Sequence, residues 1–259
     1  MRYALFVPVV ATTLVCITTP AAAITNGTAD GDAHPEVGAL VDDKPNPDRT
    51  WTYCTGTLIS PTVFLTAAHC GEADQGTARV TFDKHYKRGS TLYTGRFIQD
   101  SRFDPKAEVH DMAVVVFDKP VPGIKPAQLP PEGLLDRLKA DKTLQTSRFT
   151  PVGYGSLNPT KQKGPERSGY HYTDIRHQTT ISFKGLSRRW LDLSLSNEGD
   201  GSTCFGDSGG PNFLGGPESH LLVATSISGA DDACKSTNYD YRLDSASARK
   251  FLGKHVTLP

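Results

Sequence analysis

The most informative part of the chain is the octet Cys204-Phe205-Gly206-Asp207-Ser208-Gly209-Gly210-Pro211. It sets three glycines and a proline around one serine, a density typical of backbone that another group approaches closely. A serine in such a loop has an exposed hydroxyl beside outward-pointing N–H groups, as a nucleophile with an oxyanion site requires. The alternative is a tight surface turn held by a disulfide. The rest of the chain favours the first interpretation.

A serine nucleophile needs a base to take its proton, and the base needs a group that orients it. The candidate base is His69, because it stands beside Cys70 where the apolar run 63–68 ends. The candidate orienting group is Asp111, which precedes the apolar run 112–117. An aspartate that enters a fully apolar strand is costly unless it is paired, so a histidine partner suits it.

Length and composition favour an all-β protein with a sizeable core. The 259 residues suffice for one large β domain or two small ones. The 28 basic and 28 acidic residues balance, which argues against nucleic acid or an anionic membrane as a partner. Glycine (24) and proline (18) are frequent and strand-like runs outnumber helical ones, so turns should be many.

The first 23 residues have the pattern of a secretory signal peptide. Arg2 supplies the positive start, residues 4–17 form an apolar run too short to span a membrane, and residues 18–23 are small. Cleavage is expected after Ala23, which would leave Ile24 as the first residue. We therefore expect a secreted, extracellular protein with no membrane partner.

Cysteine usage agrees with export. Cys16 would leave with the signal peptide, and four cysteines would remain: Cys54, Cys70, Cys204 and Cys234. An even count in an exported protein indicates two disulfides, for which three pairings are possible. A metal site is the alternative, but no C-x-x-C spacing occurs and no histidine lies near the last two cysteines. Neither a metal nor a cofactor is expected.

Short strands recur along the chain at regular spacing, which favours barrels. The expected strands cover residues 33–42, 51–60, 63–68, 78–82, 92–99, 112–117, 149–155, 176–183, 190–196, 221–228 and 239–243. Residues 244–256 have helical spacing, with Asp244 or Ser245 available as the N-cap, so a C-terminal helix should pack on a barrel.

Three segments resemble the signatures of the trypsin/chymotrypsin family of serine endopeptidases. They are Thr66-Ala67-Ala68-His69-Cys70, Asp111-Met112-Ala113-Val114 and Gly206-Asp207-Ser208-Gly209-Gly210-Pro211, in the family's order of His, Asp and Ser. The resemblance implies two packed six-stranded antiparallel Greek-key β-barrels, over about 24–130 and 131–259, with a C-terminal helix. Direct signal cleavage and only two disulfides are more similar to bacterial secreted members than to animal ones.

The resemblance also implies roles in peptide-bond hydrolysis. Ser208 would attack the scissile carbonyl, His69 would take and return the proton, and Asp111 would hold the imidazole in the right tautomer. The N–H groups of Gly206 and Ser208 would form the oxyanion hole. Ser226 would hydrogen-bond Asp111.

Two further features follow from the same resemblance. The disulfides would join Cys54 to Cys70 and Cys204 to Cys234. The ammonium group of Ile24, exposed by signal cleavage, would pair with Asp207 and shape the oxyanion hole. Export alone would then produce active enzyme.

Substrate preference would depend on a pocket whose base, by family alignment, is Ser202, with Ser228 on its wall. Members that cut after Lys or Arg usually carry Asp at the base, so an apolar or aromatic P1 residue is expected here. The pair Asp231 and Asp232 lies close enough in sequence to reach the pocket. Protein or peptide substrates and protein protease inhibitors are the implied partners of a monomeric enzyme.

Two rival functions need discrimination. The octet also fits G-x-S-x-G, the nucleophile elbow of lipases, but that fold needs an Asp and then a His after the serine, on a parallel sheet with helices. Only about fifty residues follow Ser208, with few helical patterns. The second rival is a catalytically idle binding module on the same fold, although such proteins usually lack a member of the triad.

Overall fold

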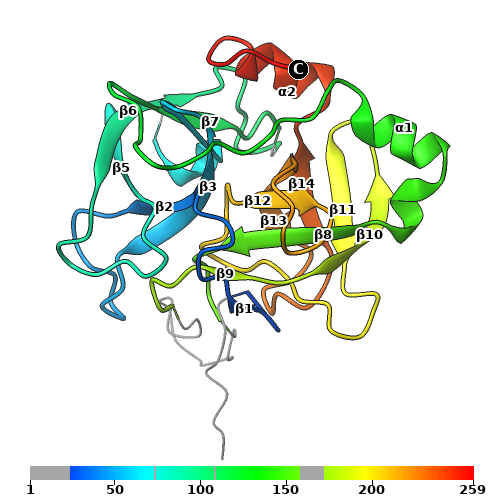
Figure 1. Cartoon of the computed structure of the whole chain (residues 1–259), viewed down its shortest axis with the longest axis horizontal. Helices are drawn as coiled ribbons and strands as arrows, with labels where there is room; N and C mark the ends of the chain where they lie inside the picture. The colour runs from blue at the N-terminus through cyan, green and yellow to red at the C-terminus, as the bar shows by residue number, and fades with distance from the viewer. Residues whose placement is uncertain (1–23, 73, 108, 158–171) are drawn as a thin grey trace, which may run out of the picture.

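The structure, a computed structural model, describes residues 24–72, 74–107, 109–157 and 172–259, so the expected signal peptide lies outside the described residues. Six antiparallel strands form a closed first barrel in the order β2-β3-β4-β7-β6-β5 (Figure 1). They are β2 (Val37–Val41), β3 (Thr52–Ser60), β4 (Val63–Thr66), β5 (Thr77–Thr81), β6 (Tyr93–Gln99) and β7 (Ala113–Phe117). The apolar run before and within β7 is almost wholly buried, as its composition predicts.

A second ring of six strands runs β8-β10-β11-β14-β13-β12 and returns to β8, so the expected pair of six-stranded barrels is confirmed. Its strands are β8 (Arg148–Gly153), β10 (Ile181–Leu186), β11 (Trp190–Ser194), β12 (Pro211–Leu214), β13 (Leu222–Gly229) and β14 (Asn238–Arg242). Short strands β1 (Thr28–Ala29) and β9 (His177–Gln178) extend this sheet beside β8.

Two strand predictions needed correction. The run 176–183 was expected as one strand, but it divides into β9 and β10. The sequence pattern also missed β12, because a four-residue strand that begins with proline has too little alternation to be recognised.

The chain ends in helix α2 (Ala246–Leu252), which confirms the expected C-terminal helix in shorter form. Ser245 is its N-cap, since its side chain accepts a hydrogen bond from the N–H of Ala248. Phe251 and Leu252 belong to an apolar cluster that contains the core of the first barrel and also Phe213 and Leu222 of the second, so the helix packs on a core shared by both barrels. A second helix, α1 (Leu134–Ala140), follows the crossing between barrels. Among the described residues no helix is long and apolar enough to cross a membrane.

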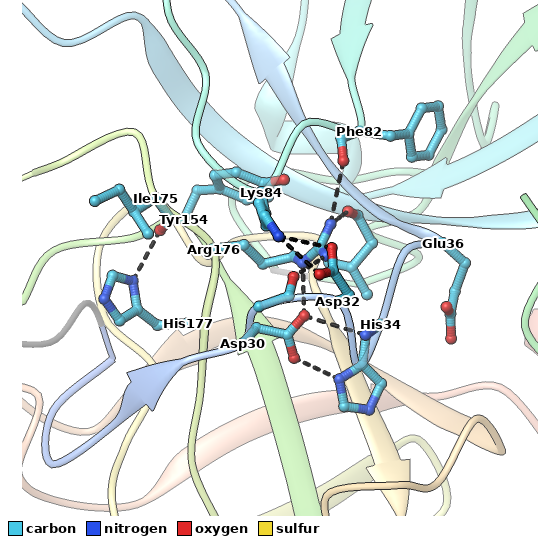
Figure 2. Close-up of polar contacts among 12 residues, drawn as sticks. Asp30, Asp32, His34, Glu36, Phe82, Lys84, Tyr154, Ile175, Arg176 and His177 are labelled. Atoms are coloured by element: carbon cyan, nitrogen blue, oxygen red, sulfur yellow. Dashed lines mark hydrogen bonds and ion pairs between the residues drawn. The ribbon is translucent and has the colours of Figure 1, made fainter.

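A buried charged cluster ties the N-terminal segment to both barrels (Figure 2). The Nε of Arg176 donates to Asp30 Oδ2 at 2.7 Å, and another guanidinium nitrogen donates to the carbonyls of Val37 at 2.9 Å and Phe82 at 3.2 Å. His34 Nδ1 lies 2.5 Å from the other oxygen of Asp30. Burial opposes ionisation of Asp30, but the hydrogen bond from His34 and the charge of Arg176 outweigh it and lower the pKa of this carboxyl.

Replacing Arg176 with methionine is expected to lower the free energy of unfolding by about 3–5 kcal/mol, because it removes the arginine partner of a buried carboxylate and leaves that carboxylate only its contact with His34. The pKa of Asp30 is lowered in the folded state, so this contribution is complete above its ordinary value of 3.8 and is lost as the pH falls through the folded value. Urea unfolding curves of the variant and the parent should therefore converge at low pH.

The matched control is Arg88→Met, which makes the same substitution at an exposed arginine. A loss below about 1 kcal/mol for Arg176→Met at pH 7, comparable to that of a surface pair, would contradict a structural role for the cluster.

Candidate active site

Strand pairing brings His69 and Asp111 together. β4 and β7 are antiparallel neighbours, so the turn that follows β4 and the residue that precedes β7 meet at one end of the first barrel. Asp111 is buried and accepts two hydrogen bonds from His69, at 2.9 Å from the backbone N–H and 2.6 Å from Nδ1. A carboxylate only accepts, so the proton of the neutral ring lies on Nδ1 and Nε2 keeps its lone pair. The ring is 36% exposed and can meet a substrate.

Gln99 holds the turn that carries His69, a contact that the sequence did not indicate. Its side-chain Nε2 donates to the carbonyl of Ala68 at 2.8 Å and to that of Gly71 at 3.0 Å. The two acceptors bracket His69, so the amide fixes the backbone on both sides of it. No local pattern marks this residue, because it ends an ordinary half-buried strand.

The octet forms the tight loop that its glycines predict. Gly206 has φ +97° and Gly209 has φ +78°, conformations that side chains rarely adopt. A Cβ on Gly209 would lie 2.3 Å from Thr66 Oγ1, so the loop also packs too closely on the first barrel for any other residue. Within the described part of the chain, the N–H groups of Gly206 and Ser208 donate to no other residue. They are therefore available to a ligand, as an oxyanion hole requires.

Asp207 is buried directly behind this loop. Its carboxyl accepts from the N–H groups of Gly155 and Cys204, each at 2.8 Å. A Cβ on Gly155 would lie 2.5 Å from the carboxyl, which explains the glycine there. Burial raises the pKa of Asp207 to about 7, despite these two hydrogen bonds. Among the described residues no cation pairs with it.

The N-terminal segment lies close to the octet. Ile24 is fully buried, and Thr25 forms an antiparallel bridge with Ser202. The N–H of Thr25 donates to the carbonyl of Ser202 at 3.0 Å. The segment therefore reaches the same part of the second barrel that contains Asp207.

All four remaining cysteines are in disulfides, Cys54–Cys70 and Cys204–Cys234, which are the pairings that the family resemblance implies. Each disulfide borders the site, one beside His69 and the other at the start of the octet. Sulfurs in disulfides are not thiolates, so the cluster of Cys54, His69 and Cys70 offers no thiolate ligand to a metal.

A pocket of about 770 Å³ opens beside His69, Gly206 and Ser208. Ser228, Asp231 and Asp232 are among the residues that line it. The other lining residues come from most of the segment 226–238 and from Tyr53, Cys54, Cys70, Tyr172, Thr203, Cys204 and Phe205.

Ser202 lies behind the floor of this pocket rather than at its surface. It is fully buried, and its hydroxyl donates to Asn238 Oδ1 at 2.6 Å. Asn238 donates in turn to Thr203 Oγ1 at 2.7 Å, and these two residues face the pocket. The family resemblance predicts Ser202 at the base of the pocket, and the structure places its hydrogen-bond partner Asn238 on the pocket lining.

Ser226 also differs from the expectation. Its hydroxyl oxygen accepts from Asn212 Nδ2 at 3.0 Å, and among the described residues it makes no hydrogen bond to Asp111. Its backbone binds the octet instead. The Ser226 carbonyl accepts a hydrogen bond from the N–H of Gly209 at 2.7 Å, and the Ser226 N–H donates to the carbonyl of Gly210 at 2.9 Å.

Comparison with known proteins gives a consistent result. The family model described as Trypsin matches residues 39–251. Granzyme M of Rattus norvegicus is 28% identical over 200 residues, covering 71% of this chain and 73% of its own. Trypsin Blo t 3 of Blomia tropicalis is 27% identical, covering 71% and 68%. The thrombin-like enzyme acutin of Deinagkistrodon acutus is 25% identical, covering 65% and 72%.

A solved structure, that of the human heparin binding protein, is similar in fold. It has a TM-score of 0.65 and 15% sequence identity, and the match covers 90% of this chain and 96% of that one. At this identity the likeness concerns the fold alone.

Proposed function

This chain belongs to the trypsin family of serine endopeptidases, and we propose that its Ser208, His69 and Asp111 form the catalytic triad. The observation that carries the proposal is one pocket lined by Ser208 and His69, with buried Asp111 hydrogen-bonded to the His69 ring and two N–H groups available beside Ser208. The substrate is a protein or peptide, cleaved at an internal bond.

The geometry supports acyl transfer through a covalent intermediate. Ser208 Oγ attacks the scissile carbonyl while its proton passes to His69 Nε2, and the N–H groups of Gly206 and Ser208 stabilise the oxyanion. His69 then gives this proton to the leaving amine as the C–N bond breaks. A water molecule repeats the sequence on the acyl-enzyme, which releases the acid and restores Ser208. Asp111 stabilises the imidazolium formed in each half.

Secretion and activation belong to the same proposal. Residues 1–23 would direct export, and their removal during export would give the buried Ile24 a free N-terminal ammonium. Asp207, a buried carboxyl with no cation among the described residues, is the group that such an ammonium would neutralise. Thr25 forms an antiparallel bridge with Ser202, which supports the proposal because it holds the residue after Ile24 on the segment that leads into the octet.

The pocket floor favours an uncharged P1 side chain. Ser202, Thr203 and Asn238 hydrogen-bond one another and carry no charge that would pair with Lys or Arg. The side chain of Asn238 is part of the pocket lining, so it takes up room that a P1 side chain would otherwise occupy. We therefore propose an apolar or aromatic P1 residue, with Asp231 and Asp232 exposed on the wall rather than at the floor.

Peptide anilides ending in Phe are expected to be cleaved with at least about tenfold higher kcat/KM than those ending in Arg. Asn238→Gly should deepen the pocket and raise kcat/KM for Phe over Val by about tenfold, because it admits the whole ring. Asp232→Asn is the control for the acidic wall and should leave the preference for Phe over Val unchanged. Equal or better turnover of the Arg substrate would overturn the proposed preference.

A catalytically idle binding protein is the second candidate, and the similar fold of the human heparin binding protein is the observation that keeps it open. A fluorophosphonate probe separates the two candidates, since only an activated serine reacts with it. Labelling at Ser208, located by mass spectrometry, is expected for the peptidase.

The pocket would also accept the inhibitory loop of a protein protease inhibitor, and the enzyme is proposed to act as a monomer.

A further inference from the structure

A carboxyl group without a counter-charge lies beneath the octet. Asp240 is on β14, directly opposite Ser226 of β13, and is fully buried. No lysine, arginine or histidine of the described chain forms an ion pair with it. The proposed mechanism does not use this group, and burial of an unpaired carboxylate is strongly unfavourable.

The amide of Asn212 joins Asp240 to Ser226. Its Nδ2 donates to Asp240 Oδ1 at 2.8 Å and to Ser226 Oγ at 3.0 Å. Two oxygens are left over, Asn212 Oδ1 and Asp240 Oδ2, and neither has a hydrogen-bond partner among the residues that the structure describes. Both belong to fully buried side chains, so their lack of partners calls for an explanation.

One proton explains both oxygens. An acid and an amide are complementary, because each offers one donor and one acceptor on the same edge. If Asp240 carries its proton on Oδ2, a small rotation lets it donate to Asn212 Oδ1 while Oδ1 keeps its present bond. The two side chains then form a reciprocal, uncharged pair.

The charges around Asp240 favour the protonated form. The one charged residue that acts on it in the described chain is Asp192 of β11, which is negative, and no titratable group faces it from β12 or β13. Burial, with this repulsion added, raises the pKa of Asp240 well above its ordinary value, although the amide of Asn212 hydrogen-bonds its Oδ1.

We propose that Asp240 is a positioning residue, whose neutral carboxyl pairs with Asn212 and so fixes the amide N–H that holds Ser226. The backbone of Ser226 hydrogen-bonds Gly209 and Gly210. The Asp240–Asn212 pair therefore stabilises the loop on which Ser208 lies. This role rests on the proposed function of Ser208 as the nucleophile.

The test compares an isosteric amide with an apolar side chain. Asp240→Asn can form the same reciprocal pair without ionising, so its kcat at pH 7 should stay within about threefold of the parent. Asp240→Leu should lower kcat by about tenfold or more with a smaller change in KM, because the loop is displaced.

The kcat of the parent, but not of Asp240→Asn, should fall at alkaline pH as the carboxyl ionises. Asp192→Asn is the matched control and should keep that alkaline fall.

Stability gives a readout independent of activity. The folded pKa of Asp240 is raised, so its contribution is favourable at low pH and is lost as the pH rises from the ordinary value toward the folded one. The free energy of unfolding of Asp240→Asn should therefore increase relative to the parent over that range. The proposal would be overturned if the difference in free energy of unfolding between Asp240→Asn and the parent stayed constant over this pH range. Equal losses of kcat in Asp240→Asn and Asp240→Leu would also overturn it. Absence of fluorophosphonate labelling in the parent would instead refute the proposed peptidase, and the stability test would still stand.

Discussion

Ser208→Ala is expected to lower kcat by a factor on the order of 10⁶, while KM changes little. The variant removes the atom that forms the acyl-enzyme but leaves the pocket and the oxyanion N–H groups in place. Hydrolysis of an internally quenched peptide, followed with purified protein that starts at Ile24, measures the loss. The residual rate should remain above that of water, because binding and the oxyanion site still act.

The control for this variant is Ser90→Ala, which removes a hydroxyl that, among the described residues, accepts only the N–H of Lys87 in a distant turn. His69→Ala should cost nearly as much as Ser208→Ala, and the double variant should cost no more than either. Residues that act as one unit are non-additive in this way. Multiplied losses in the double variant would show that the two side chains do not share one reaction step.

The residues of the proposed triad were singled out from the sequence because each carries a local signature. The glycines around Ser208 predict a loop with positive φ angles. The position of Asp111 directly before an apolar strand predicts that its carboxyl is buried and paired. The barrels followed from strands of regular spacing. The loop, the buried aspartate and each single strand depend on a few consecutive residues, so the sequence alone is enough to recognise them.

Features that depend on contacts distant in sequence were missed or misplaced. Gln99 reaches the turn around His69 from another strand, and Asn238 covers Ser202 across 36 residues. Asp240 meets Asn212 only because β12, β13 and β14 are neighbours. Nothing near these residues in the sequence marks the contact, since strand order and register decide it.

Retention of even one residue before Ile24 is expected to lower kcat/KM by about 10²–10³, the usual effect of a lost oxyanion-hole donor. An added glycine keeps the segment but moves the ammonium, so the buried Asp207 loses its proposed partner. Activity and N-terminal sequence should be measured on the same material. Full activity in a form that starts before Ile24 would refute this route of activation.

The pH dependence of stability gives a second test of the same step. Without the ammonium, the pKa of Asp207 is about 7 against an ordinary 3.8. A raised carboxyl pKa means that stability is lost as the pH rises from the ordinary value to the folded one, here by about 4 kcal/mol at about 1.4 kcal/mol per pH unit. In the form that starts at Ile24, the ion pair should remove most of this slope.

Asp207→Asn should therefore act in opposite directions in the two forms. In the form with the added glycine it removes an unpaired buried charge, so urea unfolding at pH 8 should show a more stable protein. In the form that starts at Ile24 it leaves the inserted ammonium without its carboxylate, so both stability and kcat/KM should fall. Destabilisation of both forms to the same extent would mean that Asp207 serves only its hydrogen bonds to Gly155 and Cys204.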